Sequence, residues 1–381
     1  MCTIRQATAL LSFALLLGGA HPALAQFYLQ HNLVSDLPGA DLQDLSLVNS
    51  WGLVSSPTSP FWVANNGTDT STLYNTSGPV MKVAITALPC QCVMVPGDPT
   101  GIVFNGNSAS FHLPGGGPAA RFIFDAEDGS ISAWAGGTTA TAVVPPSDKV
   151  YKGLTIASTT MGGDFLYATD FHDGKVDVYD SSFVLQDMPG AFADPKLPKG
   201  YAPFGIRNID GIIYVTYALQ DADAHDDVAG QGHGFINAFT TDGTLIRRVA
   251  SRGTLDSPWG LAKAPADFGK FSGDLLVGNF GNGKIHAYDP NSLQGNGQYK
   301  RRGVLHSANG PPLKIDGLWA LSFGNDHSAG PHNTLFFTAG PQGESHGLFG
   351  SLVVTTPPKG DKGNDQDNDQ GNGQDDDPSD D

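Results

Sequence analysis

Oxygen-bearing side chains recur in the same setting along the chain and are the first candidates for chemistry. Asn65, Asp170 and Asn279 each follow directly on a short, mainly apolar run of residues. Carboxylate and amide oxygens are the ligands that Ca²⁺ prefers, so these residues could hold a divalent cation. Asparagine and aspartate are also common in β-turns, where their side chains bond to nearby backbone. A metal site and plain turn chemistry are therefore both open interpretations.

Histidines add a second candidate for metal binding. Residues 220–232 form a long polar segment with four aspartates and His225, and His233 follows it directly. Long loops in compact domains often carry function, and these residue types could bind Ca²⁺ or Zn²⁺. The spacing of known zinc motifs is missing, so a solvated surface loop is the alternative. His172 could face this loop or could be a hydrogen-bonded surface group.

An aromatic set opens successive segments of the chain. A motif of one aromatic or polar residue, then glycine, then leucine or isoleucine begins at Trp51, Thr100, Lys152, Phe204 and Trp259, with a degenerate copy at Trp319. Aromatic rings with a few convergent polar groups typically form ligand sites. We therefore expect ligand binding by Trp51, Lys152, Phe204, Trp259, Trp319 and His172. The nucleophile-elbow, zinc-protease and phosphate-loop motifs are all missing from the sequence.

Both residue sets recur because the chain is a repeat. Six units of roughly fifty residues each carry the motif, a β-rich run and a glycine-led segment, which is the period of a propeller blade. We predict an all-β, six-bladed β-propeller, since a β-sandwich would show strands without this six-fold repeat. In a propeller, the loop before each inner strand and the loop after the second strand reach the same mouth. The two residue sets should therefore meet there.

The last unit lacks a fourth strand. Only three strand-like segments precede Pro357, whereas residues 27–34 form a strand-like run that no other unit uses. An open sheet edge invites aggregation. We therefore predict that this N-terminal run pairs into the last blade and closes the ring.

The two ends of the chain differ in composition from the predicted propeller at residues 26–358. Residues 1–25 carry Arg5, an apolar run and a small-residue cleavage site at Ala23–Ala25, which predicts a secretory signal. We expect export to the periplasm or outside the cell, without a membrane span. Residues 359–381 contain nine aspartates against two lysines and are expected to be disordered.

Charge and cysteine content narrow the partners. The net charge of −17 argues against a nucleic-acid partner, and we expect a monomer that meets a small molecule, glycan or protein at the channel mouth. Removal of the signal leaves Cys90 and Cys92. They predict a strained local disulfide or two packed thiols, with a copper or redox site as the alternative.

Several stretches resemble a family of uncharacterised exported bacterial proteins that often end in a PEP-CTERM sorting signal. They are residues 30–36, 49–53, 62–67, 99–105, 167–172 and 257–261. The resemblance implies a six-bladed propeller and no particular activity. More loosely, the units resemble NHL-repeat and gluconolactonase-like propellers. That resemblance implies an axial divalent ion, with Asn65, Asp170 and Asn279 as its ligands here.

Two functions follow from these patterns. The first is an extracellular or periplasmic module that binds its ligand at an aromatic-lined channel mouth. The alternative is a metal-dependent hydrolase of lactone or ester type, in which Ca²⁺ or Zn²⁺ polarises a carbonyl and activates water. In that case Asp170 would act as ligand or base.

Overall fold

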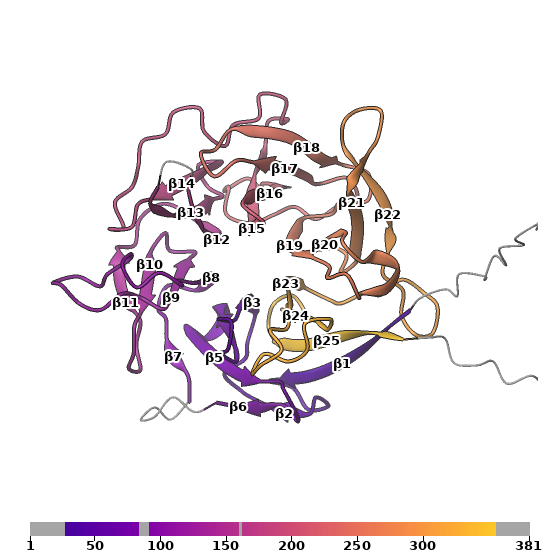
Figure 1. The fold of residues 1–381 in the computed structure, drawn as a ribbon, viewed down its shortest axis with the longest axis horizontal. Coiled ribbons are helices and arrows are strands. Elements are labelled where there is room, and N and C mark those ends of the chain that lie inside the picture. Colours follow the sequence, from indigo (N-terminus) through magenta and orange to yellow (C-terminus); the bar gives the residue numbers. More distant parts are fainter. Residues whose placement is uncertain (1–26, 84–90, 160–161, 356–381) are drawn as a thin grey trace, which may run out of the picture.

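Six sheets surround a central axis in the computed structural model, which describes residues 27–83, 91–159 and 162–355 (Figure 1). The helices in this part of the chain are two short 3-10 turns, η1 (Asn66–Thr68) and η2 (Gly269–Phe271). This confirms the predicted all-β, six-bladed β-propeller. The predicted signal, the acidic tail and Cys90 lie outside the described residues.

One strand of each sheet lines the axis. These inner strands are β3 (Ser50–Val54), β8 (Pro99–Phe104), β12 (Tyr151–Ser158), β15 (Tyr201–Ile209), β19 (Pro258–Lys263) and β23 (Leu318–Phe323). The second strands are β4 (Phe61–Asn65), β9 (Phe122–Ala126), β13 (Asp164–Asp170), β16 (Ile212–Leu219), β20 (Leu275–Asn279) and β24 (Leu335–Ala339). Each blade is sandwiched between two others, so every residue of β4, β9, β20 and β24 is buried.

The remaining strands lie farther from the axis. The third strands are β5 (Thr70–Asn75), β10 (Ile131–Trp134), β14 (Lys175–Tyr179), β17 (Phe235–Phe239), β21 (Ile285–Leu293) and β25 (Leu348–Thr355). The outer strands are β6 (Met81–Lys82), β7 (Val93–Met94), β11 (Thr141–Val144), β18 (Leu245–Ser251) and β22 (Tyr299–Val304). Within the described residues, the blade of β12, β13 and β14 has three strands.

The motif glycines lie where neighbouring inner strands touch. A Cβ added at Gly101 would lie 2.3 Å from Leu154 N, and one at Gly205 would lie 2.3 Å from Trp259 O. Both atoms belong to the backbone of the next inner strand, so no side chain fits between the strands. A β-bulge next to the motif interrupts the pairing of inner and second strand in all six blades.

Side-chain hydroxyls strengthen these contacts between blades. Thr169 Oγ1 donates to the carbonyl of Phe204 at 2.8 Å, and Thr100 Oγ1 donates to the carbonyl of Tyr151 at 2.9 Å. Both threonines are buried, and each bond joins one blade to the next around the ring. The inner strands are therefore fixed relative to one another by hydrogen bonds as well as by close packing.

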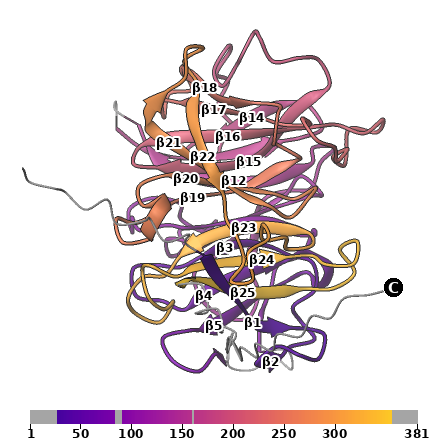
Figure 2. The ribbon, with the colours of Figure 1, turned by 90° about the vertical axis from the view of Figure 1, so that its right-hand side faces the viewer.

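The N-terminal strand closes the ring, as predicted. Strand β1 (Phe27–Ser35) pairs antiparallel with β25 from Phe27↔Thr355 to Ser35↔Leu348, and β2 (Leu42–Gln43) adds a parallel edge (Figure 2). Tyr28 is fully buried against Phe268, with ring centroids 5.1 Å apart. The strand thus contributes both a ladder of backbone bonds and a core side chain.

Two further observations concern the cysteines and the membrane. Cys92 is buried and disulfide-bonded. Its predicted partner Cys90 is outside the described residues, so the local pairing stays a prediction. Among the helices of the described residues, none has the length and apolar character needed to cross a membrane.

Deleting residues 26–34 should destabilise the whole propeller, because it exposes the edge of β25 and removes the buried Tyr28. We expect the melting temperature to fall by roughly 10 °C or more. The control is deletion of residues 359–381, which should leave the melting temperature unchanged. An N-terminal deletion that melts like the full chain would contradict the closure of the ring by β1.

Candidate functional site

The two predicted residue sets lie at one mouth of the channel. The strand register pairs the first residues of the inner strands with the last residues of the second strands, as in Ser50↔Asn65, Tyr151↔Asp170 and Pro258↔Asn279. The loops before the inner strands and after the second strands therefore share this mouth. Side chains from distant parts of the sequence meet there.

The aromatic residues fill the axis. The rings of Trp51 and Trp319 stack with centroids 3.5 Å apart, and Trp259 meets both of them edge-on. Phe280 stacks on Trp319 at 4.0 Å, and Phe204 lies 5.8 Å from it. Trp51, Phe204 and Trp319 are at most 2% exposed, whereas Trp259 is half-buried. We call these five residues the aromatic plug, because they block the channel rather than offer an open platform at the mouth.

Lys152 lies against the plug beneath a layer of polar residues. Its side chain is 2% exposed, and its Nζ atom forms ion pairs with Glu127 and, at 3.0 Å, with Asp226. The same atom lies 5.3 Å from the ring centroid of Trp51, within the range of a cation–π contact. Burial favours loss of its proton, but attraction to the two carboxylates outweighs this effect and raises the pKa of Lys152.

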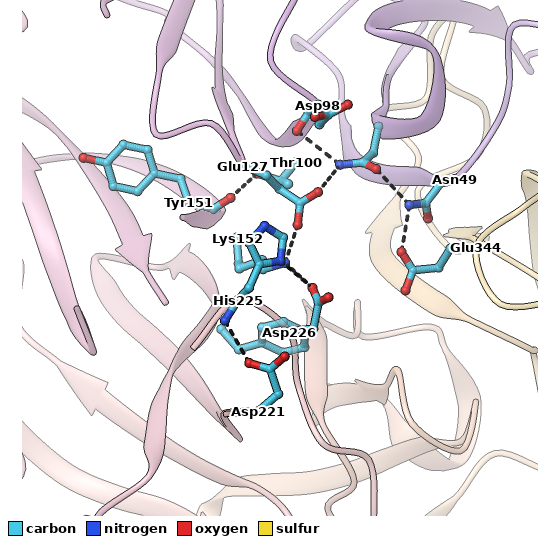
Figure 3. Close-up of polar contacts among 12 residues, drawn as sticks. Asn49, Asp98, Thr100, Glu127, Tyr151, Lys152, Asp221, His225, Asp226 and Glu344 are labelled. Carbon is cyan, nitrogen blue, oxygen red and sulfur yellow. Dashed lines mark hydrogen bonds and ion pairs between the residues drawn. The ribbon is translucent and has the colours of Figure 1, made fainter. Parts of the chain in front are cut away.

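Amide side chains connect this ion pair to the first and last blades (Figure 3). Asn66 Nδ2 donates to Glu127 Oε2 at 2.8 Å, while its Oδ1 accepts from Asn49 at 2.9 Å. Asn49 also donates to Glu344 Oε2 at 2.8 Å and accepts from the indole of Trp319 at 3.2 Å. The polar layer and the aromatic plug therefore form one bonded unit.

Asn49 and Glu344 have an unusual backbone conformation. Their φ angles are 44° and 66°, a left-handed region that residues other than glycine seldom adopt. Such strain is common at functional sites, where the surrounding structure holds the side chain in place. The hydrogen bond between Asn49 and Glu344 supplies that support here.

Three side chains at the mouth could hold a metal ion together. Glu127, His225 and Asp226 each offer one ligand atom, and these atoms lie within 4.8 Å of one another. His225 Nδ1 lies 3.0 Å from Asp226 Oδ1, and the backbone N–H of His225 donates to Asp221. His225 and Lys152 were candidates from the sequence. Glu127 and Glu344 were missed, although Glu127 follows the second strand of its blade just as Asn66 does.

The predicted ligands Asn65, Asp170 and Asn279 make their side-chain contacts within their own blades. Asn65 Nδ2 donates to Thr70 and Thr72, both at 3.1 Å. Asp170 forms an ion pair with Lys149 at 3.3 Å. Asn279 Nδ2 donates to the carbonyl of Thr254 at 2.8 Å. These contacts are turn and strand-end chemistry, and they do not join the three residues to one another.

The other two predicted histidines lie beside the long loop of residues 220–232. His172 is exposed, and its carbonyl accepts a hydrogen bond from Gln220 at 3.3 Å. His233 Nδ1 lies 2.7 Å from the carbonyl of Val228, within the loop region itself. Neither histidine belongs to the group formed by Glu127, His225 and Asp226.

Several acids at the mouth hold their protons more tightly than usual. Burial is the largest cause that raises the pKa of Glu344, and the charge of Glu127 adds to it. Burial also raises the pKa of Asp98, and it raises the pKa of Asp227 to about 6. For Asp227 and Glu344, the positive charge of Lys152 lowers the pKa and offsets only part of this effect of burial. An added cation would therefore be stabilised at this mouth.

Sequence comparison places the chain in a family. It is 33% identical over 330 residues to the uncharacterized protein R648 of Acanthamoeba polyphaga mimivirus, which covers 81% of this chain and 76% of that protein. It is 32% identical over 335 residues to the uncharacterized protein L690 of the same virus, covering 81% of each. The chain belongs to the family of these proteins. No protein-family model matches it.

Solved structures share its fold at low sequence identity. A catalytically inactive virginiamycin B lyase from Staphylococcus aureus with quinupristin has a TM-score of 0.50 and 13% identity, covering 87% of this chain and 100% of that chain. An α-L-arabinofuranosidase from Fusarium graminearum with an iminosugar inhibitor has a TM-score of 0.50 and 11% identity, covering 86% and 98%. These likenesses show the β-propeller fold alone.

The gluconolactonase-like resemblance gains no further support. A putative 6-phosphogluconolactonase from Bacteroides uniformis has 17% identity and a TM-score of 0.37, covering 67% of this chain and 70% of that chain. This score is too low for an argument about lactonase chemistry.

Replacing Lys152 by methionine should destabilise the fold, because Glu127 would remain partly buried without its cation. We expect a loss of about 3 kcal/mol in the free energy of unfolding, measured by urea denaturation. Lys263→Met is the matched control, since Lys263 pairs with Asp210 on the surface and should contribute less than about 1 kcal/mol. Equal losses for the two variants would contradict the assigned role of Lys152.

Proposed function

We propose that the chain is an exported propeller that binds a cationic ligand at the mouth formed by Glu127, His225, Asp226 and Glu344. The observation that carries this proposal is the charge balance around Lys152. One buried ammonium is shared by Glu127 and Asp226, while Glu344 and Asp227 close by still have raised pKa values. A further positive charge at the mouth would stabilise the ionised forms of these carboxyl groups.

A divalent cation fits the donor set best. Carboxylate oxygens and one imidazole nitrogen suit Zn²⁺, and carboxylates with amide oxygens suit Ca²⁺. The exposed positions of His225 and Asp226 leave the group accessible. An amine-bearing small molecule or a basic protein segment would satisfy the same charge. The proposal places no sugar on Trp51 or Trp319, since both are buried.

Export belongs to the same proposal. It is supported by the signal-like composition of residues 1–25 and by the resemblance to exported bacterial proteins, including those with a PEP-CTERM signal. A monomeric propeller outside the cytoplasm would meet free divalent cations and cationic ligands directly.

Titration with CaCl₂, MnCl₂ and ZnCl₂ tests the cation site. At least one of these ions should raise the melting temperature and give saturable binding in calorimetry. The double variant Glu127→Gln, Asp226→Asn should lose this binding by at least roughly tenfold, since it removes two of the three ligands. Asp210→Asn, an exposed acid at the turn between β15 and β16, is the control and should bind like the parent chain.

The same titration has a defined pH dependence. Because burial raises the pKa of Asp227 to about 6, this carboxyl loses its proton as the pH rises from 5 to 7. Cation affinity should therefore increase from pH 5 to pH 7. Affinity that is unchanged across this range, or full binding by the double variant, would contradict the proposed site.

A second candidate function is metal-dependent hydrolysis of a lactone or ester. The observation that favours it is the proximity of His225, a possible proton acceptor, to Glu127 and Asp226. A bound metal would polarise the substrate carbonyl and activate water. A panel of lactones and aryl esters, assayed with each metal, should then show turnover that His225→Ala abolishes. Metal binding without turnover would be consistent with the cation-binding function and would exclude hydrolysis of the lactone and ester classes tested.

A further inference from the structure

A second chamber lies on the opposite side of the aromatic plug. The far halves of the inner strands line a partly open cavity of about 250 Å³, with Trp259 in its lining. The residue that follows each motif glycine, such as Leu53, Ile102, Leu154 and Leu261, adds an aliphatic side chain to the wall. The plug separates this cavity from the acidic mouth. A ligand of this cavity would therefore not contact the acidic mouth.

One charged side chain lines this cavity. Arg207 lies on β15, two residues after the motif glycine Gly205. The equivalent positions of the other blades carry small or apolar residues: Val54, Val103, Thr155, Ala262 and Ser322. Arg207 is thus the one charged residue at this position of the six repeats.

The guanidinium of Arg207 has no counterion in the part of the chain that the structure describes. Within the described residues, no hydrogen bond or ion pair of its side chain is found, and no acidic side chain lines the cavity. Asp210, which shares a neighbouring hollow with Arg207, is paired with Lys263. Burial lowers the pKa of Arg207, although a guanidinium keeps its proton in proteins. Arg207 is half-buried, so its guanidinium keeps some contact with solvent in the cavity, while no acidic side chain in the lining offsets its charge. A bound anion would supply that missing partner.

Neighbouring polar groups are already occupied. Asn208 donates through Nδ2 to the carbonyl of Ile156 at 3.0 Å, and its Oδ1 accepts from Gly211 N at 3.1 Å. Thr155 Oγ1 accepts from Asn208 N at 2.9 Å and keeps its own proton available. The cavity therefore offers one planar cation, the hydroxyls of Ser55 and Thr155, and aliphatic side chains.

We propose that this cavity binds a small monocarboxylate with an apolar body, held by Arg207. A guanidinium binds a carboxylate through two parallel hydrogen bonds, and the aliphatic walls accept the apolar part of the ligand. The volume lies just below the ~300–1,000 Å³ of pockets for drug-sized ligands, which limits the ligand to a small molecule. A net charge of −17 disfavours phosphates and other multiply charged anions.

The test uses benzoate, phenylacetate and isovalerate, with benzamide as the neutral match for benzoate and inorganic phosphate as the competing anion. Binding to the purified full-length chain is followed by calorimetry, melting temperature and tryptophan fluorescence, because Trp259 lines the cavity. At least one carboxylate should bind saturably, whereas benzamide and phosphate should not. Loss of the charged contact in Arg207→Met should weaken that binding by at least roughly tenfold.

Two further variants keep the result interpretable. Arg121→Met removes an exposed arginine outside the cavity and should bind like the parent chain. Arg207→Lys keeps the charge but loses the two-pronged contact, so its affinity should fall between the parent and Arg207→Met. In the absence of ligand, Arg207→Met should melt at or above the parent temperature, because it removes an unpaired, half-buried charge from among apolar side chains.

The proposal is overturned if no carboxylate binds, if benzamide or phosphate binds equally well, or if Arg207→Met retains the affinity. This site is independent of the acidic mouth. The double variant Glu127→Gln, Asp226→Asn should therefore keep full carboxylate binding, and failure of the cation titration would not count against the carboxylate site.

Discussion

The close approach of neighbouring inner strands is the constraint on which the rest of this propeller depends. At Gly101, Gly205 and Gly260 the backbone of the next blade lies within 2.4 Å of the point that a Cβ would occupy. Contact this close makes the channel narrow enough for a few rings to block it. Trp51 and Trp319, stacked 3.5 Å apart, do so. The motif glycines thus allow the inner strands to pack closely, and the aromatic plug then divides the narrow channel into two chambers.

The two chambers have opposite chemistry. On one side, Glu127, Asp226 and Glu344 surround the ammonium of Lys152. On the other, Arg207 faces an aliphatic cavity without a counterion among the described residues. Trp259 touches both regions, since its indole donates to the carbonyl of Lys152 at 2.8 Å while its ring lines the cavity. β-Propellers carry many different functions, which depend on differences in their loops and channels. The shared fold alone therefore does not identify the function of this chain.

The sequence predicts the fold well because the repeat is a direct consequence of packing. Glycine stands at the contact between inner strands in five blades and Ala320 in the sixth, so the spacing of this motif reports the number of blades. One leftover strand identifies the closing segment. The site is harder to predict. Glu127 and Glu344 lie in loops that come together only when the ring closes. Glu127 shares its position after the second strand with Asn66, whereas nothing local marks Glu344. The burial of Trp51 and Trp319 could not be predicted from the sequence either, because it depends on the width of the channel. Arg207 does stand out when the repeats are aligned. An anion site can be inferred only from the structure, which shows that Arg207 has no counterion among the described residues.

Anomalous diffraction from a crystal of the full chain soaked in MnCl₂ tests the central claim most directly, which is that the acidic mouth binds a cation. Mn²⁺ accepts carboxylate and imidazole ligands and scatters anomalously, so its position is observed independently of any activity. We expect one strong peak between Glu127, His225 and Asp226, in contact with at least one carboxylate oxygen. A mouth without a peak, with Lys152 still held by Glu127 and Asp226 at saturating Mn²⁺, would contradict the account.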